Sequence, residues 1–242
     1  MPATVPAAAA RPSYRYYDLI LAAFVVVLLL SNLIGAGKVA IVRLPWLGEV
    51  SYSAGVLFFP ISYFFGDVLT EVYGYAYDRR AVWAGFAALL FAAAMSAVVV
   101  ALPAARDPYM TGYQDHLLAV FGNTPRIVLG SILAFWAGSL SNAVVLAKLK
   151  IWSAGRHLWF RAIASTAVGE AIDSTLFYML AFYAIWPTAQ ILHVALVQYL
   201  VKTAWEIVAT PLTYWIVGRL KRAERRDHYD RGTDFTPFRL KL

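Results

Sequence analysis

The chain has 242 residues, of which 61% are hydrophobic and only 14% are charged. Soluble domains contain about 45–50% apolar and about 25% charged residues, so this composition favours an integral membrane protein within a lipid bilayer. There is no cysteine, which excludes disulfides and any cysteine-based metal or redox site. A net charge of +7 would suit a nucleic-acid partner, but the basic residues cluster where membrane topology requires them. We therefore expect no nucleic-acid partner.

Six stretches of the sequence are long and apolar enough to cross a bilayer. A hydrocarbon core of about 30 Å needs about 20 mostly apolar helical residues. The sequence therefore predicts an all-α, polytopic membrane protein, a six-helix transmembrane bundle with spans at 19–41, 52–74, 81–102, 127–149, 162–186 and 194–218. The predicted division is a disordered cytoplasmic N-terminus over 1–17, a six-span domain over 18–220 and a basic cytoplasmic tail over 221–242.

Basic residues predict the orientation of these spans, because loops on the cytoplasmic side retain an excess of Lys and Arg. The two termini and the loops on their side contain 16 Lys and Arg, whereas the loops on the other side contain 4. Both termini are therefore expected in the cytoplasm. A cleaved signal peptide over the first span is the alternative, but its apolar run is longer than such a segment needs.

Polar residues inside the spans are candidates for a functional site, because ionisable groups at that depth are costly. Two amides, Asn32 and Asn142, fall within the first and fourth spans. The ionisable residues come in pairs three or four positions apart, so each pair shares one side of its helix. These pairs are Asp67 with Glu71, Glu170 with Asp173, and Lys202 with Glu206.

Acids outnumber bases in this set. Five carboxylates accompany Lys202, the one base within a span, while Lys38 and Lys148 fall at helix ends. Unpaired acids in a low dielectric take up protons or attract a cationic or donor-rich ligand. A structural alternative is that Lys202 and Glu206 neutralise each other. Glu71 is expected to be an interfacial residue, since basic residues lie just beyond it.

A short pattern, Ser-Asn-x5-Lys, occurs twice, as "SNLIGAGK" at 31–38 and "SNAVVLAK" at 141–148. It precedes a Gly-acid dipeptide in each half, at Gly66 and Gly169. An inverted internal duplication, common among transporters, would explain the pattern. Chance similarity would explain it equally well, because the spacing between the two elements differs between the halves.

No arrangement of residues predicts catalysis. The four histidines fall in loops, at span ends or in the tail, so no buried Ser–His pair is available for hydrolysis. The sequence also contains no Gly-rich nucleotide-binding loop with its lysine. Aromatic residues within spans, such as Tyr63 and Phe177, could pack or stack on a planar ligand. The sequence predicts neither an enzyme nor a cofactor.

The run "FFPISYFFGDVLTEVYGYAYDRRAVW" at 58–83, with the two Ser-Asn patterns and "VGEAIDSTLF", resembles the bacterial queuosine precursor transporter family, also called the vitamin uptake transporter family. The resemblance covers residues 17 to about 220. It implies an inner-membrane importer of 7-deazaguanine precursors, chiefly the 7-cyano form. It also implies an architecture similar to the substrate-binding subunits of energy-coupling-factor vitamin transporters, several of which are oligomers, and it leaves a homo-oligomer open.

Such a planar, nucleobase-like substrate gives the polar residues a role. A deazaguanine presents a ring N–H beside an exocyclic amine, and one carboxylate accepts both. We expect Glu170, with Asp173 or Asp67, to bind this edge, and Asn32, Asn142 or a lysine to donate to the carbonyl. Tyr63 or Phe177 would supply an aromatic face. The remaining ionisable residues are expected in coupling or ion pairs; they are Glu71, Lys202, Glu206, Lys38 and Lys148.

Three functional classes stay open on the sequence. The chain could be a solitary secondary transporter or facilitator, or a binding subunit that requires a separate membrane protein and ATPases. An intramembrane enzyme is the third, and the absence of a buried histidine argues against it. Another purine or a vitamin would also satisfy the carboxylates, because any guanidine-like edge presents the same donors.

Overall fold

The computed structural model describes residues 14–35, 39–45, 48–53, 58–122 and 125–239. Within these ranges the fold is α-helical apart from one β-hairpin. The elements in chain order are α1 (Tyr17–Leu30), the π-helical turn η1 (Ser31–Gly35), β1 (Val39–Leu44), β2 (Gly48–Ser53), α2 (Phe59–Tyr73), α3 (Tyr75–Ala101), α4 (Pro108–Phe121), α5 (Pro125–Trp152), α6 (Leu158–Phe182) and α7 (Thr188–Glu224).

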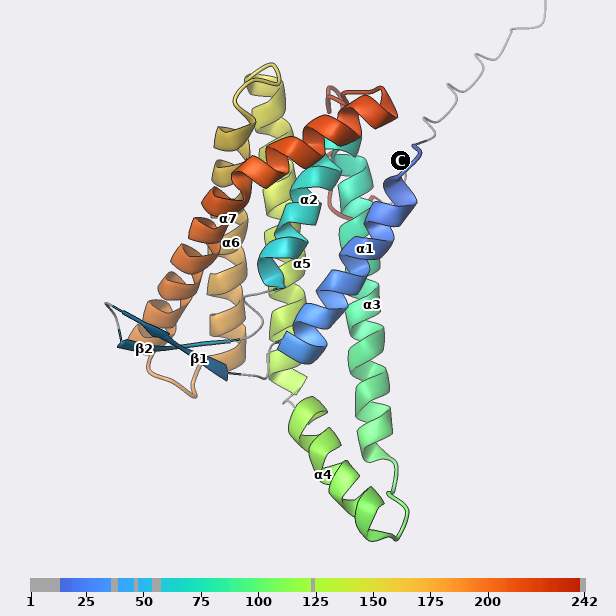
Figure 1. Cartoon of the computed structure of the whole chain (residues 1–242), viewed down its shortest axis with the longest axis vertical. Helices are drawn as coiled ribbons and strands as arrows, with labels where there is room; N and C mark the ends of the chain where they lie inside the picture. The colour runs from blue at the N-terminus through green and yellow to red at the C-terminus, as the bar shows by residue number, and fades with distance from the viewer. Residues whose placement is uncertain (1–13, 36–38, 46–47, 54–57, 123–124, 240–242) are drawn as a thin grey trace, which may run out of the picture.

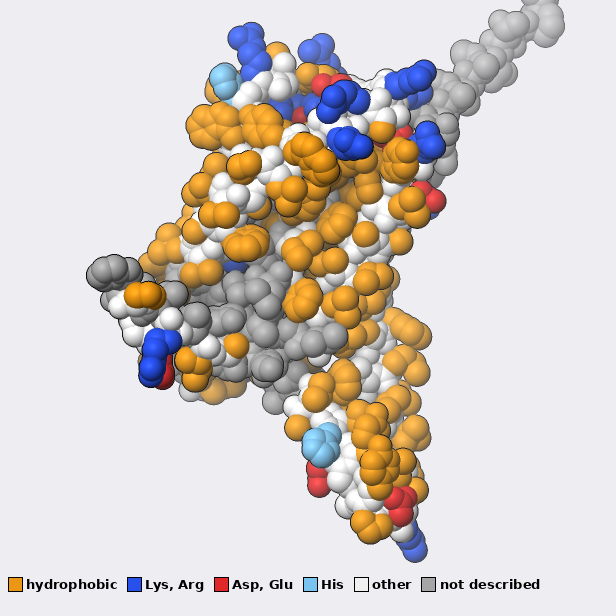
Figure 2. All heavy atoms as spheres, in the orientation of Figure 1, with side chains coloured by type: hydrophobic (Ala, Val, Ile, Leu, Met, Phe, Trp, Pro, Cys, Tyr) orange, Lys and Arg blue, Asp and Glu red, His pale blue; other side chains and the backbone are white. Residues whose placement is uncertain are grey.

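The helices form a bundle with α2 at its centre. α2 packs against α1, α3, α5 and α7, and the most extensive helix contact is between α5 and α6. In Figure 1, α7 lies beside α6 on one side of the bundle, while the lower part of α3 projects with α4 on the other. Apolar side chains cover the flanks of the bundle in Figure 2. Helices that are apolar on all sides are typical of a membrane environment.

Three helices among the described residues are long and apolar enough to cross a membrane, namely α3, α5 and α7. α6 has 25 residues and would be long enough, but it carries Arg161, Glu170 and Asp173. Lys and Arg side chains gather at the end of the bundle where α1, α3 and α6 begin and α2, α5 and α7 end (Figures 1 and 2). We call this the basic end.

The first predicted span, a continuous helix over 19–41, is wrong in its second half. α1 ends at Leu30, η1 follows, and Val39 begins β1. β1 pairs antiparallel with β2, with Val39 opposite Ser53 and Leu44 opposite Gly48. The β-branched residues in "VAIVRL" favour a strand, and Gly48 has the positive φ of 73° that a tight hairpin turn requires.

Two predicted loops are largely helical. The segment 103–126 contains α4, which begins with Pro108 and is capped where the Asp107 carboxylate accepts a hydrogen bond from the Met110 N–H at 2.9 Å. The loop predicted between the second and third spans is reduced to Gly74, whose φ of 91° separates α2 from α3. Glycine suits this position because it adopts positive φ without strain.

The segment after α7, residues 225–239, folds back over the basic end; we call it the tail. Tyr75 of α3 donates its backbone N–H to Asp230 at 3.1 Å, and Arg79 donates to the carbonyl oxygens of Asp234 and Thr236 at 2.8 and 2.7 Å. Trp83, one turn beyond Arg79 on α3, donates to the Pro237 carbonyl at 2.8 Å. The tail therefore packs on the helices as part of the folded unit.

Candidate functional site

The closest approach of α5 and α6 positions the polar residues of the two helices. A Cβ on Gly138 would lie 2.9 Å from the Gly169 carbonyl oxygen and 2.8 Å from the Asp173 Cβ. A Cβ on Gly169 would meet the Gly138 carbonyl oxygen at 2.9 Å and the Asn142 Cβ at 2.8 Å. Only glycine permits this approach, and as a result Asn142 and Asp173 lie one turn further along their helices on the shared face.

Seven residues from four helices meet around this approach, and we call them the central cluster. They are Tyr63 and Asp67 of α2, Asn142 of α5, Glu170 and Asp173 of α6, and Lys202 and Glu206 of α7. All except Asp173 and Lys202 are buried. The Asn142 side-chain amide donates to Asp67 Oδ1 at 2.8 Å, which joins α5 to α2.

Lys202 joins α7 to α6. Its Nζ lies 2.5 Å from Asp173 Oδ2 and 2.8 Å from Glu170 Oε2, so one ammonium bridges both carboxylates. The same Nζ lies 5.9 Å from the centre of the Tyr63 ring. The charge of Lys202 is thus directed at the two acids of the neighbouring helix, whereas the sequence alternative paired it with Glu206.

Several buried polar atoms of this region have no hydrogen-bond partner among the described residues. They are Tyr63 Oη, Asp67 Oδ2, Asn142 Oδ1, Ser174 Oγ and Glu206 Oε1. A buried polar atom without a partner is destabilising, so each is available for a ligand group or a proton. No group of three or more acidic or histidine side chains suited to a metal ion occurs in the described part of the chain.

Three residues predicted to belong to this site lie elsewhere or outside the described residues. Asn32 donates to the Leu28 carbonyl at 3.0 Å and accepts from Ser131 Oγ at 3.2 Å. Ser131 precedes Asn142 by eleven residues on α5, a separation of about 16 Å along the helix. Phe177 packs on Tyr178 with ring centres 5.0 Å apart, one turn beyond Asp173. Lys38 is outside the described residues.

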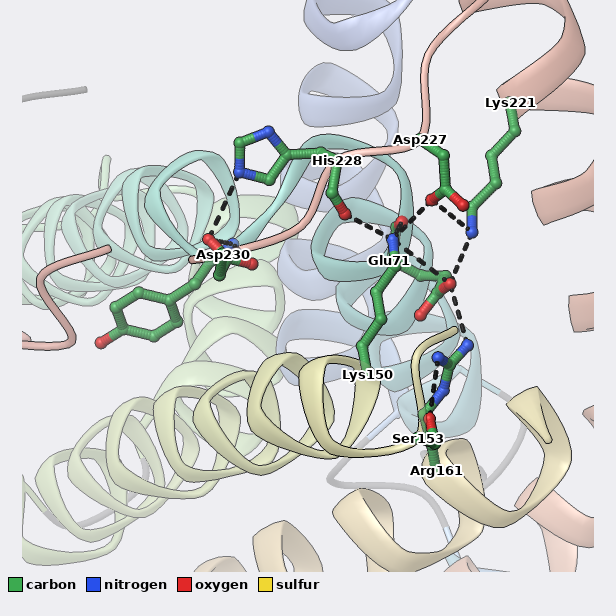
Figure 3. Close-up of polar contacts among 9 residues, drawn as sticks. Glu71, Lys150, Ser153, Arg161, Lys221, Asp227, His228 and Asp230 are labelled. Atoms are coloured by element: carbon green, nitrogen blue, oxygen red, sulfur yellow. Dashed lines mark hydrogen bonds and ion pairs between the residues drawn. The ribbon is translucent and has the colours of Figure 1, made fainter. Parts of the chain in front are cut away.

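A second set of charges lies closer to the basic end, and we call it the basic-end cluster (Figure 3). Glu71 Oε1 accepts from Arg161 at 3.0 Å and from Lys221 at 2.6 Å, with Lys150 at 3.4 Å. Asp227 of the tail lies 2.7 Å from Lys150 and 2.8 Å from Lys221. Two carboxylates and three cations thus connect α2, α5, α6, α7 and the tail.

Hydrogen bonds hold the acids of the tail in their charged form. Burial of Asp227 opposes ionisation, but the hydrogen bonds from Lys150 and Lys221 outweigh burial and lower its pKa below the ordinary value. Burial likewise opposes ionisation of Asp230, and hydrogen bonds from the His228 side chain and the Tyr75 backbone outweigh it, which lowers the pKa of Asp230.

The basic-end cluster corrects two sequence interpretations. Glu71 is 1% exposed and its Oε1 lies within 3.4 Å of three cations, so a buried ion-pair cluster replaces the expected interfacial position. Lys148 is exposed, its Nζ 5.5 Å from the centre of the Phe235 ring, whereas Lys150 is the buried lysine of α5. Four participants were not predicted: Lys150, Arg161, Lys221 and Asp227. The basic residues were interpreted only as topology signals, although Lys150 and Arg161 flank the same short turn.

Comparison with known proteins identifies two similarities. Residues 53–216 match the family model described as "Putative vitamin uptake transporter". Over 170 residues the chain is 38% identical to a Bacillus subtilis (strain 168) protein named "Probable queuosine precursor transporter", with 69% of each chain covered. No solved structure matches the chain.

Proposed function

This chain belongs to the vitamin uptake transporter family, and we propose that it is a bacterial inner-membrane importer of queuosine precursors of the 7-cyano-7-deazaguanine class. The observation that carries the proposal is the buried Glu170 and its half-buried neighbour Asp173, both bridged by Lys202 within an apolar bundle. A relative named as a queuosine precursor transporter supports the same substrate class.

We infer six membrane crossings, made by α1 with η1, α2, α3, α5, α6 and α7, with the basic end and both termini in the cytoplasm. The excess of basic side chains at one end supports this orientation. α2 has 15 residues and covers only about 22 Å, less than a bilayer core. Helices that begin within the membrane are a recurrent way in which secondary transporters form binding sites near the midplane.

The central cluster offers the groups that a deazaguanine requires. The ring N–H and exocyclic amine would donate to the Glu170 carboxylate, where they replace the ammonium of Lys202 while that ammonium stays on Asp173. Lys202 or Asn142 would donate to the ring carbonyl. The Tyr63 ring, already within 5.9 Å of Lys202 Nζ, is placed to cover the face of a planar base.

The second candidate is a substrate-binding subunit of an ATP-driven uptake system, the role that the resemblance to energy-coupling-factor subunits suggests. The exposed apolar surface of α3 favours this second candidate, because only 11% of the residues in the most apolar stretch of the helix are buried within the chain. Lipid would cover the same surface equally well, so we place the solitary transporter first.

The test uses bacteria that can neither make nor import deazaguanines and that contain no energy-coupling-factor ATPase. The full chain is expressed, low 7-cyano-7-deazaguanine is supplied, and queuosine in tRNA is measured. The proposal predicts queuosine with the chain alone. Queuosine that appears only with an added ATPase module would identify the chain as a binding subunit. Absence of queuosine both with and without the module, in cells whose membranes contain the protein, would exclude this solute.

Glu170→Gln tests the site itself, because glutamine keeps the shape but cannot accept two donors as a carboxylate does. Hydrogen bonds to a charged group contribute about 1.5–3 kcal/mol, so the half-saturating concentration should rise about 10- to 100-fold. The matched control is Glu49→Gln, since Glu49 is exposed and pairs with Arg43 on the hairpin. Normal import by Glu170→Gln would show that Glu170 does not bind the solute.

A further inference from the structure

Two acids of the central cluster, Asp67 and Glu206, have roles that the proposed ligand contacts leave open. We propose that Asp67 and Glu206 together bind one transported proton, so that the chain couples solute import to proton import. This inference rests on the proposed function and adds its energy source. The site is the face shared by α2 and α7, one turn closer to the basic end than Tyr63 and Lys202.

The register of α2 and α7 brings these acids together. Both helices run toward the basic end, and Lys202 lies over the Tyr63 ring. One turn further along each helix are Asp67 and Glu206, each four residues on and therefore on the same face as its predecessor. α2 and α7 pack directly against each other. The register therefore places the two carboxyls at the same level of the α2–α7 contact.

Both acids lie in surroundings that disfavour two charges. Asp67 is 2% and Glu206 1% exposed. The Asn142 amide satisfies one oxygen of Asp67, while Asp67 Oδ2 and Glu206 Oε1 have no hydrogen-bond partner among the described residues. Burial without a counter-ion and repulsion between neighbouring acids both favour the neutral form. One proton removes a charge and supplies the donor that the free oxygens need.

The charged groups around Asp67 and Glu206 do not supply the positive charge that this proton provides. α6 presents Glu170 and Asp173, which add negative charge, and α2 itself carries Glu71 one turn nearer the basic end. The cation on α7, Lys202, is bound to the two α6 carboxylates at 2.8 and 2.5 Å. Tyr63 adds a neutral hydroxyl, and Asp78 at the start of α3 is a further buried acid, whose Oδ1 would lie 3.8 Å from a Cβ on Gly66. The pair therefore lies in a predominantly acidic environment.

In this arrangement the solute and the proton bind to different acids, as a symporter requires. The solute donates to Glu170 and so stabilises the α6 carboxylates, while the proton neutralises one of Asp67 and Glu206. Moving charge through a low-dielectric layer is costly, so the bundle should reorient more readily with the proton bound. The proton leaves the same carboxyl as a proton in the cytoplasm, so no other reactant is required.

The functional test uses the purified full chain in liposomes with a pH-sensitive dye in the lumen. Addition of 7-cyano-7-deazaguanine outside should acidify the lumen, and an acidic exterior should drive accumulation of the solute. Glu206→Gln should keep exchange of labelled for unlabelled solute across the membrane but lose acidification and pH-driven accumulation. Glu49→Gln serves as the control and should keep all three.

Two results would overturn the proton site. One is pH-driven accumulation that persists in Glu206→Gln. The other is wild-type exchange of the solute without any acidification, which would make the chain a facilitator.

A second measurement does not depend on the solute. A protonated carboxyl has an infrared C=O band that a carboxylate lacks, so the wild type at neutral pH should show a band that is absent from the double variant Asp67→Asn/Glu206→Gln. An identical carboxyl band in both proteins would overturn the proton site. A band that is lost in the double variant, together with a wild type that exchanges no deazaguanine, would support the proton site and refute the solute instead.

Discussion

Glu71→Gln is predicted to destabilise the bundle more than any substitution of an exposed acid. Glu71 is 1% exposed and contacts three cations within 3.4 Å. With Asp227 the cluster has two negative and three positive charges, and the substitution leaves one negative charge against three positive. Removing one partner of a buried ion pair costs about 3–5 kcal/mol, because the remaining charges are left uncompensated in a low dielectric.

The assay is thermal unfolding of the purified chain in detergent, followed by loss of the monodisperse species. Glu71→Gln should lower the midpoint clearly, whereas Glu49→Gln, which breaks an exposed pair worth at most about 1 kcal/mol, should leave it nearly unchanged. A second variant, Glu71→Gln/Lys221→Met, removes one surplus cation and should recover part of the loss. Equal midpoints for Glu71→Gln and Glu49→Gln would refute the argument that these buried charges stabilise the fold.

Three further predictions follow from the same contacts. Gly138→Ala places a Cβ 2.9 Å from an α6 carbonyl oxygen and should reduce solute import at least tenfold, whereas Gly218→Ala, with open space around it, should not. Lys202→Met leaves two carboxylates without their shared cation and should abolish import in the same assay while the protein still reaches the membrane. Asp227 and Asp230 have a lowered pKa in the docked tail, so their contribution to docking is complete above about pH 4 and is lost as the pH falls further. Spin labels on the tail and on α3 should therefore move apart only in acid, and separation near neutral pH would contradict this.

Helical periodicity predicted which residues share a face but did not identify their partners. The i, i+3 spacing placed Glu170 and Asp173 together, and the structure has both on one lysine. The i, i+4 spacing also paired Asp67 with Glu71, yet these acids belong to different clusters. A helix turn covers about 5.4 Å, so two residues one turn apart can meet different neighbours. Asp67 meets Asn142, and Glu71 meets Arg161.

The contacts that the sequence did not predict depend on backbone geometry outside the spans. The Lys150 ammonium donates to the Glu71 carbonyl oxygen at 2.7 Å and to the His228 carbonyl oxygen at 2.6 Å. The second contact exists because the tail folds back over the basic end. Hydropathy gives no information on where a polar tail docks. The hairpin was missed for a related reason, since Val and Ile are equally common in strands and in apolar spans.

The two clusters differ in charge balance. From this difference we infer a structural role for the basic-end cluster and a transport role for the central cluster. The basic-end cluster contains three cations and two carboxylates, so its charges nearly balance. The central cluster contains four acids and Lys202. Within an apolar bundle an excess of three negative charges is not tolerated. It must be compensated by protons and by a ligand rich in donors, and an importer of a donor-edged base that also transports a proton supplies both.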